Sequence, residues 1–449
     1  MLQAHTSDQR LALRGDLLDF AAAPLLASTA MHGVRWRPDH WLLIENGRIC
    51  GAQPGAHAPD ASWTRADHSG CLILPGFIDT HVHSAQLDVI ASFGTELLDW
   101  LNTYTFPAER AWADPRLAQA GSQRFLDALL AHGTTSAVVF PTVHKVSVDA
   151  LFAAASERGM RMITGKVLMD RHAPDGLRDD VDVAESECRA LIERWHGKGR
   201  NAYAVTVRFA PTSTPAQLAM AGRLCAADPL LYMQTHLAEN RAEVAWVAEL
   251  FPKARSYLDV YESAGLLHRR CVLAHGIWLD DADRARLRAT AAQISFCPSS
   301  NLFLGSGLFD WQRNADAGVN VSLASDVGGG TSLSMQRTMA DAYRVQALAG
   351  RKVSAWALLH AATRGAALAL DLDDEIGSFD AGCTADVCVW DWAVAEVARR
   401  RIDVARDVHE RVFAWLTLSD ERCLVAAYVA GVKQGSTQQT SRRMPGTTP

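Results

Sequence analysis

The sequence predicts an α/β protein, a (β/α)8 barrel of the TIM type beside a small β-sandwich built from the two ends of the chain. Two observations support this prediction. Between residues 71 and 374, apolar runs of strand length alternate with longer amphipathic stretches, which is the pattern of repeated strand–helix units. Short strand-like runs precede this region and return after it. At 449 residues, the chain is long enough for a barrel and a smaller domain.

The two ends of the chain both show short strands with turn residues between them. In the N-terminal segment, 1–70, two apolar runs flank Asn46-Gly47, a dipeptide typical of β-hairpin turns. Strand-like runs return in 375–433. We therefore expect 1–70 and 375–433 to combine in one β-sandwich beside a barrel of residues 71–374. The polar tail, 434–449, has the composition of a disordered segment.

Eight apolar runs in the central region have the length of barrel strands. The first lies within 72–78, just before His81. The others, in chain order, are 134–140, 161–169, 203–209, 231–236, 271–275, 293–297 and 319–326. Eight strands alternating with helices form a closed barrel, whose active site lies at the carboxyl ends of the strands.

Histidines and an aspartate stand where several of these runs end. His81 and His83 follow the first run, and residues i and i+2 of a strand point to the same side. The fifth, sixth and eighth runs end in His236, His275 and Asp326. A single histidine at such a position is more often a core residue, but the combination of five favours a metal centre. Imidazole and carboxylate ligands suit Zn²⁺, with Fe²⁺ as the alternative.

Composition excludes several other classes of protein. The net charge of −6 and the pI of about 6.2 provide no basic surface for nucleic acid. The nine cysteines form no CxxC pair, so neither a disulfide framework nor a cysteine zinc site is indicated, and a reducing cytoplasm fits best. The N-terminus has no signal-peptide pattern, and no apolar run is long enough to span a membrane.

These motifs resemble those of the amidohydrolase superfamily, in which HxH, two further histidines and an aspartate surround the metal. Many members bridge two metals with a lysine after the fourth strand. Here the fourth run ends in Arg208, which implies a single metal, as in the deaminase branch. Longer runs resemble the guanine deaminase family. They are 75–86, 97–109, 169–172, 207–213, 296–305 and 325–328.

The resemblance implies hydrolytic deamination of guanine to xanthine and ammonia by a metal-activated water, in purine catabolism or salvage. It also implies a homodimer. Glu239, three residues after His236, would move a proton from the water to a ring nitrogen, and Asp326 would accept the second proton. The metal ligands it implies are His81, His83, His236 and Asp326, with His275 either a fifth ligand or the group that orients the water.

Three residues are implied to bind the purine: Gln86, Arg208 and Phe209. The arginine offers fixed donors to a carbonyl oxygen, and the glutamine amide can both donate and accept. The competing interpretation is structural. Arg208 would form an ion pair with Glu109 or Asp170, and Gln86 would make a loop hydrogen bond.

Other interpretations of the same motifs remain open. The substrate could be another amino-substituted heteroaromatic compound, such as 8-oxoguanine, a pterin or an s-triazine. A non-catalytic barrel is disfavoured, because such relatives lack the metal ligands and this chain keeps every candidate. The cytidine-deaminase type of fold requires HxE and PCxxC, and this sequence contains no PCxxC.

Overall fold

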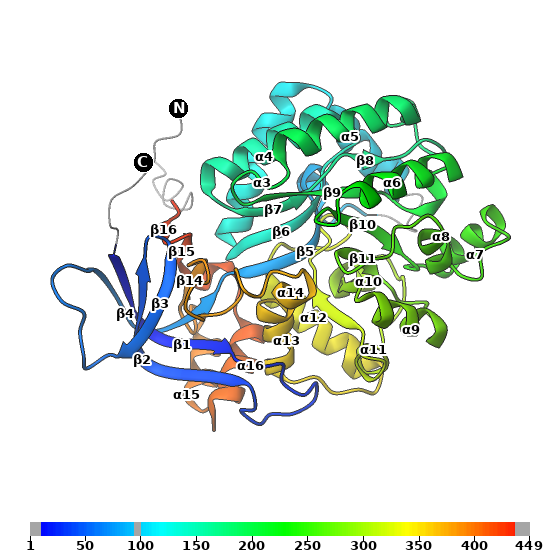
Figure 1. The fold of residues 1–449 in the computed structure, drawn as a ribbon. Helices are drawn as coiled ribbons and strands as arrows, with labels where there is room; N and C mark the ends of the chain where they lie inside the picture. The colour runs from blue at the N-terminus through cyan, green and yellow to red at the C-terminus, as the bar shows by residue number, and fades with distance from the viewer. Residues whose placement is uncertain (1–9, 94–99, 436–449) are drawn as a thin grey trace, which may run out of the picture.

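The computed structural model describes residues 10–93 and 100–435, and it confirms the predicted α/β barrel. Neighbouring barrel strands are parallel and follow the order β5, β6, β7, β9, β10, β11, β12, β13. Figure 1 shows helices surrounding these strands and a second sheet to one side. The barrel strands are β5 (Phe77–His83), β6 (Thr134–Phe140), β7 (Arg161–Thr164), β8 (Val167–Leu168), β9 (Asn201–Val207), β10 (Tyr232–Leu237), β11 (Cys271–His275), β12 (Gln293–Phe296) and β13 (Asn320–Leu323).

Helices follow the barrel strands and cover the outside of the barrel. Those between β5 and β10 are η1 (Ser84–Val89), η2 (Leu101–Thr105), α2 (Phe106–Ala111), α3 (Pro115–Ala131), α4 (Lys145–Arg158), α5 (Val181–Trp195), η3 (Ala210–Thr212) and α6 (Pro215–Ala227). Those after β10 are α7 (Arg241–Leu250), α8 (Tyr257–Ser263), α9 (Asp281–Thr290), α10 (Pro298–Phe303), α11 (Trp311–Asp316), α12 (Met335–Leu348), α13 (Ala355–Ala361) and α14 (Arg364–Ala369). None of the described helices is long and apolar enough to cross a membrane.

The two ends of the chain form one sheet, as predicted. The order is β16, β15, β14, β4, β1, β2, β3, with antiparallel pairing except between β1 and β4. The hairpin at Asn46-Gly47 is confirmed, because β2 and β3 pair across it. Strands from both halves of the sheet contribute to one hydrophobic cluster. Arg48 of β3 also forms a β-bridge with Thr384, just before β14, so the sheet curls around this cluster. Its strands are β1 (Arg10–Phe20), β2 (Val34–Glu45), β3 (Arg48–Pro54), β4 (Thr64–Pro75), β14 (Val387–Trp390), β15 (Leu424–Val429) and β16 (Val432–Lys433).

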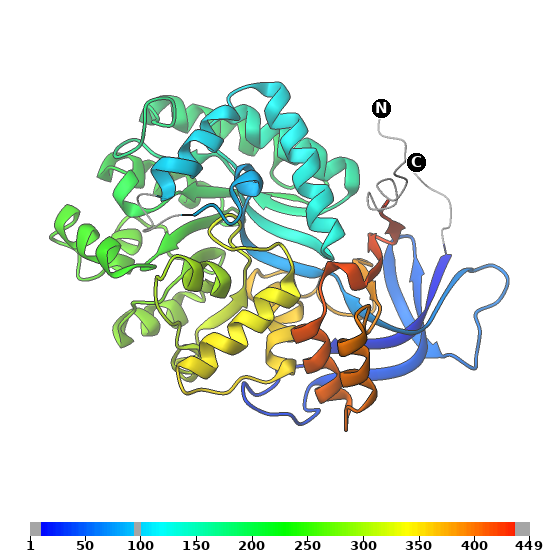
Figure 2. The ribbon, with the colours of Figure 1, turned by 180° about the vertical axis from the view of Figure 1, so that it is seen from behind.

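The C-terminal segment also contains helices that the sequence pattern did not predict. They are α15 (Glu396–Asp403), α16 (Val408–Leu418) and η4 (Glu421–Cys423). Helix α16 packs against α12 and α13, and Figure 2 shows the orange helices beside the yellow α12. This segment therefore connects the small sheet to the barrel. Of the tail predicted to be disordered, residues 436–449 lie outside the described part of the chain.

The apolar run predicted as the first barrel strand is divided between two sheets. Leu72–Pro75 belongs to β4 of the small sheet, and β5 of the barrel begins at Phe77. Gly76 lies between them, and its N–H donates to the carbonyl of Asp386 at 2.9 Å. A β-carbon at Gly76 would lie 2.2 Å from Oγ1 of the buried Thr135. Only glycine fits, because the chain passes against β6 as it leaves one sheet for the other.

The amino-terminal end of the barrel is filled by side chains and covered by α14. Ile78, Val138 and Val272 form one buried cluster with Ala366 and Leu370. The hydroxyl of Tyr232 donates to the carbonyl of Leu370 at 2.7 Å, and the N–H of Ile78 donates to Ala362 at 2.9 Å. The barrel is therefore closed at this end.

We predict that Gly76→Ala destabilises the fold by about 1–3 kcal/mol, because the added methyl group overlaps Thr135 and overpacked sites resist expansion. Urea unfolding measures the change. Gly435→Ala is the control, since a β-carbon there meets no atom within 4 Å. Equal midpoints for Gly76→Ala and the unchanged protein would contradict the proposed constraint.

Candidate active site

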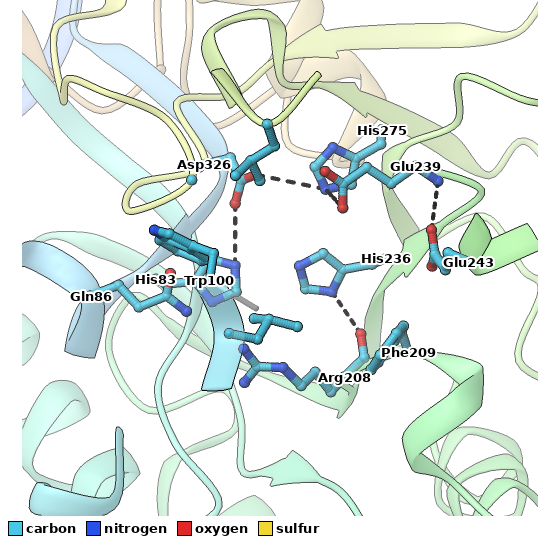
Figure 3. Close-up of a pocket in the computed structure, with 13 residues that line it drawn as sticks. His83, Gln86, Trp100, Arg208, Phe209, His236, Glu239, Glu243, His275 and Asp326 are labelled. Carbon is cyan, nitrogen blue, oxygen red and sulfur yellow. Dashed lines mark hydrogen bonds and ion pairs between the residues drawn. The ribbon is translucent and has the colours of Figure 1, made fainter. Parts of the chain in front are cut away.

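A pocket opens at the carboxyl ends of the barrel strands. Its lining includes His83, His236, His275 and Asp326. Figure 3 shows Asp326, His275 and Glu239 along one side of the pocket, with His236 near its centre. His83 lies beside Gln86, and Arg208 and Phe209 lie below His236 in this view. The structure therefore brings the predicted strand-end residues together. It also places the three predicted substrate-binding residues within reach of them.

His81 and His83 come from β5 and point to the same side, as strand alternation predicts. Their Nε2 atoms are 3.3 Å apart. Oδ1 of Asp326 lies 3.1 Å from Nε2 of His81 and 3.3 Å from Nε2 of His83. Asp326 follows the last barrel strand, and its N–H donates to the carbonyl of His81 at 2.9 Å. The first and last strands thus present these three side chains at one point.

The two remaining histidines are held by hydrogen bonds on the nitrogen that faces away from the pocket. Nδ1 of His236 lies 2.6 Å from the carbonyl oxygen of Arg208. A carbonyl only accepts, so this nitrogen carries the proton and Nε2 keeps its lone pair. Nδ1 of His275 lies 2.8 Å from Oδ1 of Asn301. Among the described residues, Nε2 of His275 has no hydrogen-bond partner, although it is buried.

Two of these residues have backbone angles that side chains rarely adopt. His275 has φ of 73° and Asp326 has φ of 49°. Residues in the left-handed region cost free energy, and in native proteins they occur preferentially at functional sites. Here the unusual angles turn both side chains inward just after their strands end.

Electrostatics favours the neutral forms of His81 and His236 and the charged form of Asp326. Burial lowers the pKa of His81 to about 4 and that of His236 well below its ordinary value. Burial opposes ionisation of Asp326, but His81 and His83 hold its pKa well below the usual range. One ligand atom from each of these four residues lies within 4.8 Å of the others. Three nitrogen lone pairs and a carboxylate fit a divalent cation.

His275 differs, because two carboxylates face it. Its Nε2 lies 3.6 Å from Oε2 of Glu239 and 3.7 Å from Oδ2 of Asp326. Burial opposes its protonation, yet the charges of Glu239 and Asp326 raise the pKa of His275 above its ordinary value. This arrangement suits a group that holds a water molecule or shares a proton.

Glu239 is buried at the start of α7 and is fixed on two sides. Ser306 Oγ donates to Oε1 of Glu239 at 2.8 Å, and the backbone N–H of Glu239 donates to Oε2 of Glu243 at 3.0 Å. Burial raises the pKa of Glu239, which His275 partly offsets. A carboxyl group with raised pKa in a pocket is suited to transfer protons.

Three further residues of the site, Glu243, Ser306 and Asn301, were not predicted from the sequence. Burial, reinforced by the charge of Glu239, raises the pKa of Glu243 to about 7. The spacing of Asn240 and Glu243 is that of a capping box at a helix N-terminus, which is the signal that indicates Glu243. Asn301 lies in the 296–305 run, but its contact with His275 depends on the tertiary structure.

The predicted substrate residues Gln86 and Arg208 share one buried partner. Arg208 forms an ion pair with Glu109 at 2.6 Å, as its structural interpretation required, and not with Asp170. Gln86 Nε2 also donates to Glu109, at 2.9 Å. Both side chains also line the pocket with Phe209, so the ion pair with Glu109 does not exclude a binding role.

Comparison with known proteins identifies the family. The model of the amidohydrolase family matches residues 72–432. The chain belongs to the amidohydrolase family.

Among its relatives, guanine deaminase of Escherichia coli (strain K12) is 43% identical over 424 residues, covering 94% of this chain and 96% of the relative. The solved structure of E. coli guanine deaminase superposes with a TM-score of 0.91, covering 95% of this amidohydrolase and 99% of that chain at 41% identity. Guanine deaminase from C. acetobutylicum, solved with bound guanine in its active site, gives a TM-score of 0.84 at 26% identity, covering 95% and 100% of the two chains.

We predict that His83→Ala weakens metal binding by this amidohydrolase more than about 100-fold, because even residues that only support a ligand cost 10–100-fold when removed. Metal content after dialysis, measured by mass spectrometry, tests this. His172→Asn is the control. His172 lies outside the cluster, and asparagine tolerates its positive φ of 47°. Equal metal content in both variants would place the cation elsewhere.

Proposed function

We propose that this amidohydrolase converts guanine and water to xanthine and ammonia. The observation that carries the proposal is the pairing of a cation site with Arg208 and Gln86 in one pocket. It is supported by the relative that was solved with guanine in its active site. The reaction belongs to purine catabolism or salvage, and the pocket takes a flat heterocycle with a carbonyl group.

The metal is proposed to be one Zn²⁺ per chain, with Fe²⁺ as the alternative. His81, His83, His236 and Asp326 would hold it, because their ligand atoms lie within 4.8 Å of one another. When bound, such a cation lowers the pKa of a water ligand to roughly 7 and so provides a nucleophile at neutral pH. His275 would orient this water or serve as a fifth ligand.

Glu239, Asp326 and His275 are proposed to move the protons. Glu239 would take a proton from the attacking water and give it to ring nitrogen N3 of guanine. Asp326 would take the second proton and help the amine to leave as ammonia. His275 lies between the two carboxylates, 3.6 Å from Glu239 and 3.7 Å from Asp326, where it can hold the water between them.

Arg208, Gln86 and Phe209 are proposed to hold the purine. Arg208 would donate to the O6 carbonyl of guanine, since its guanidinium presents fixed donors. Gln86 would pair with the mixed donor and acceptor edge, and the Phe209 ring or backbone would contact the base. A homodimer and a cytoplasmic location complete the proposal. The nine cysteines are all free, which fits a reducing compartment.

Metal-loaded protein mixed with guanine is expected to release ammonia and xanthine in equal amounts. An ammonia assay measures the first product, and absorbance measures the second. Adenine is expected to react more slowly by a factor on the order of 10⁴, because it leaves the carbonyl-binding groups unpaired. If 8-oxoguanine, a pterin or an s-triazine releases ammonia and guanine does not, the proposed substrate is wrong, but the proposed type of reaction, hydrolytic deamination, stands.

We predict that Glu239→Gln lowers kcat by about 10²–10⁴-fold without loss of metal, since the amide cannot accept the proton. Steady-state rates with guanine and the metal content of each sample measure this. Glu249→Gln, at an exposed position of α7, which begins two residues after Glu239, should leave both unchanged. A Glu239→Gln rate close to that of the unchanged protein would refute the assignment.

A further inference from the structure

A buried carboxylate stands behind the two groups that are proposed to recognise the purine. Glu109 is fully buried. It accepts hydrogen bonds from Nε2 of Gln86 at 2.9 Å and from Nη1 of Arg208 at 2.8 and 2.6 Å. The two side chains come from different parts of the barrel, one after β5 and one after β9. Glu109 is their common partner.

The chemistry of Glu109 decides which way the Gln86 amide faces. The oxygen and nitrogen of an amide have nearly the same shape, so sterics alone would allow either orientation. An ionised carboxylate only accepts, and therefore the NH2 group of Gln86 must face Glu109. Oε1 of Gln86 then accepts the N–H of Gly328 at 3.1 Å. As far as the described residues show, one amide hydrogen and one oxygen lone pair of Gln86 remain for a ligand.

Glu109 also anchors the Arg208 guanidinium at one end. Both of its bonds are made to Nη1, which leaves Nε and Nη2 as the donors not bonded to Glu109. The ring of Phe106 lies 5.2 Å from the guanidinium carbon. The carboxylate neutralises the buried arginine as well. The pair therefore offers directed donors without a net charge, which suits a neutral carbonyl compound better than an anion.

Local structure explains why Glu109 and Phe106 act on the same arginine. They lie three residues apart on α2, so they share one face of the helix. The turn before this helix, η2, is a π-helix, and such turns occur often at functional sites. Trp100 and Leu101, close to α2 in the chain, also line the pocket.

We infer that Glu109 is the positioning residue that makes the pocket selective for a purine with a 6-oxo group. It holds Arg208 and Gln86 in the orientation in which their donors match a carbonyl oxygen. The identity of the ligand class rests on the proposed function, but the selectivity can be measured by binding alone.

The test uses two ligands that carry no 2-amino group to be released. Hypoxanthine has the 6-oxo group and purine lacks it. Calorimetry with zinc-loaded protein gives the ratio of their affinities for the unchanged chain, Glu109→Gln, Glu109→Asp and Asp179→Asn. The last variant is the matched control, because Asp179 forms another buried ion pair, with Lys166. Lys166 lies between β7 and β8, and Asp179 lies just before α5.

The unchanged protein is expected to bind hypoxanthine more tightly than purine. Glu109→Gln should lower this ratio about tenfold or more, because charged hydrogen bonds are lost and its NH2 group faces other donors. Purine affinity should change less than about threefold, and Asp179→Asn should keep the original ratio. Glu109→Asp keeps the charge but is one methylene short, so its ratio should be intermediate. It decides the matter if circular dichroism shows Glu109→Gln unfolded.

The inference would be overturned if both Glu109 variants kept the affinity ratio of the unchanged protein, or if Asp179→Asn lowered this ratio as much as Glu109→Gln does. Ammonia release from guanine by the same unchanged protein separates the two proposals. Turnover with a ratio independent of Glu109 leaves the proposed function standing and removes the inference. A ratio that depends on Glu109 without turnover keeps the inference and removes the reaction.

Discussion

The carboxylate of Asp79 joins the first and last strands of the barrel, and the arrangement of the site depends on this contact. It accepts hydrogen bonds from the backbone N–H of Ser325 at 3.0 Å and of His81 at 3.3 Å, and also from the Ser325 hydroxyl. Asp79 and Ser325 are 246 positions apart in the chain. Each is the near neighbour of a candidate ligand, so the contact that joins the two strands also places His81 and Asp326 next to each other.

The side chains that face the pocket are each held by a partner on the side away from it. Each imidazole that faces the cluster from β10 or β11 is held through its other nitrogen, His236 by a backbone carbonyl and His275 by Asn301. The opposite wall is held in the same way, with Glu109 behind Arg208 and Gln86. Groups facing the pocket are thus oriented from behind by partners that a ligand does not have to displace.

The sequence pattern predicts most of the site, because strand alternation and barrel geometry place strand ends at a common mouth. His81, His83, His236, His275 and Asp326 all follow from this rule. The pattern cannot show where the apolar run 72–78 passes from one sheet to the other, since both halves are equally apolar and Gly76 is required only by its contact with Thr135. Asn301 escapes it as well, because its contact with His275 is made by tertiary folding. Glu243 belongs to a local capping box, and strand alternation says nothing about helix ends. Helices α15 and α16 interrupt a region whose flanking strands suggested a sheet throughout.

Because α14 covers the amino-terminal end of the barrel, substrate and products must enter and leave at the other end. In the described part of the chain, the hydrogen bond from Tyr232 to Leu370 and a cluster of apolar side chains close the amino-terminal end of the barrel. Substrate, water and both products therefore use the same pocket opening at the carboxyl ends of the strands. Under the proposed reaction, xanthine must leave through this opening before the next guanine can enter. Xanthine should therefore act as a competitive inhibitor with respect to guanine.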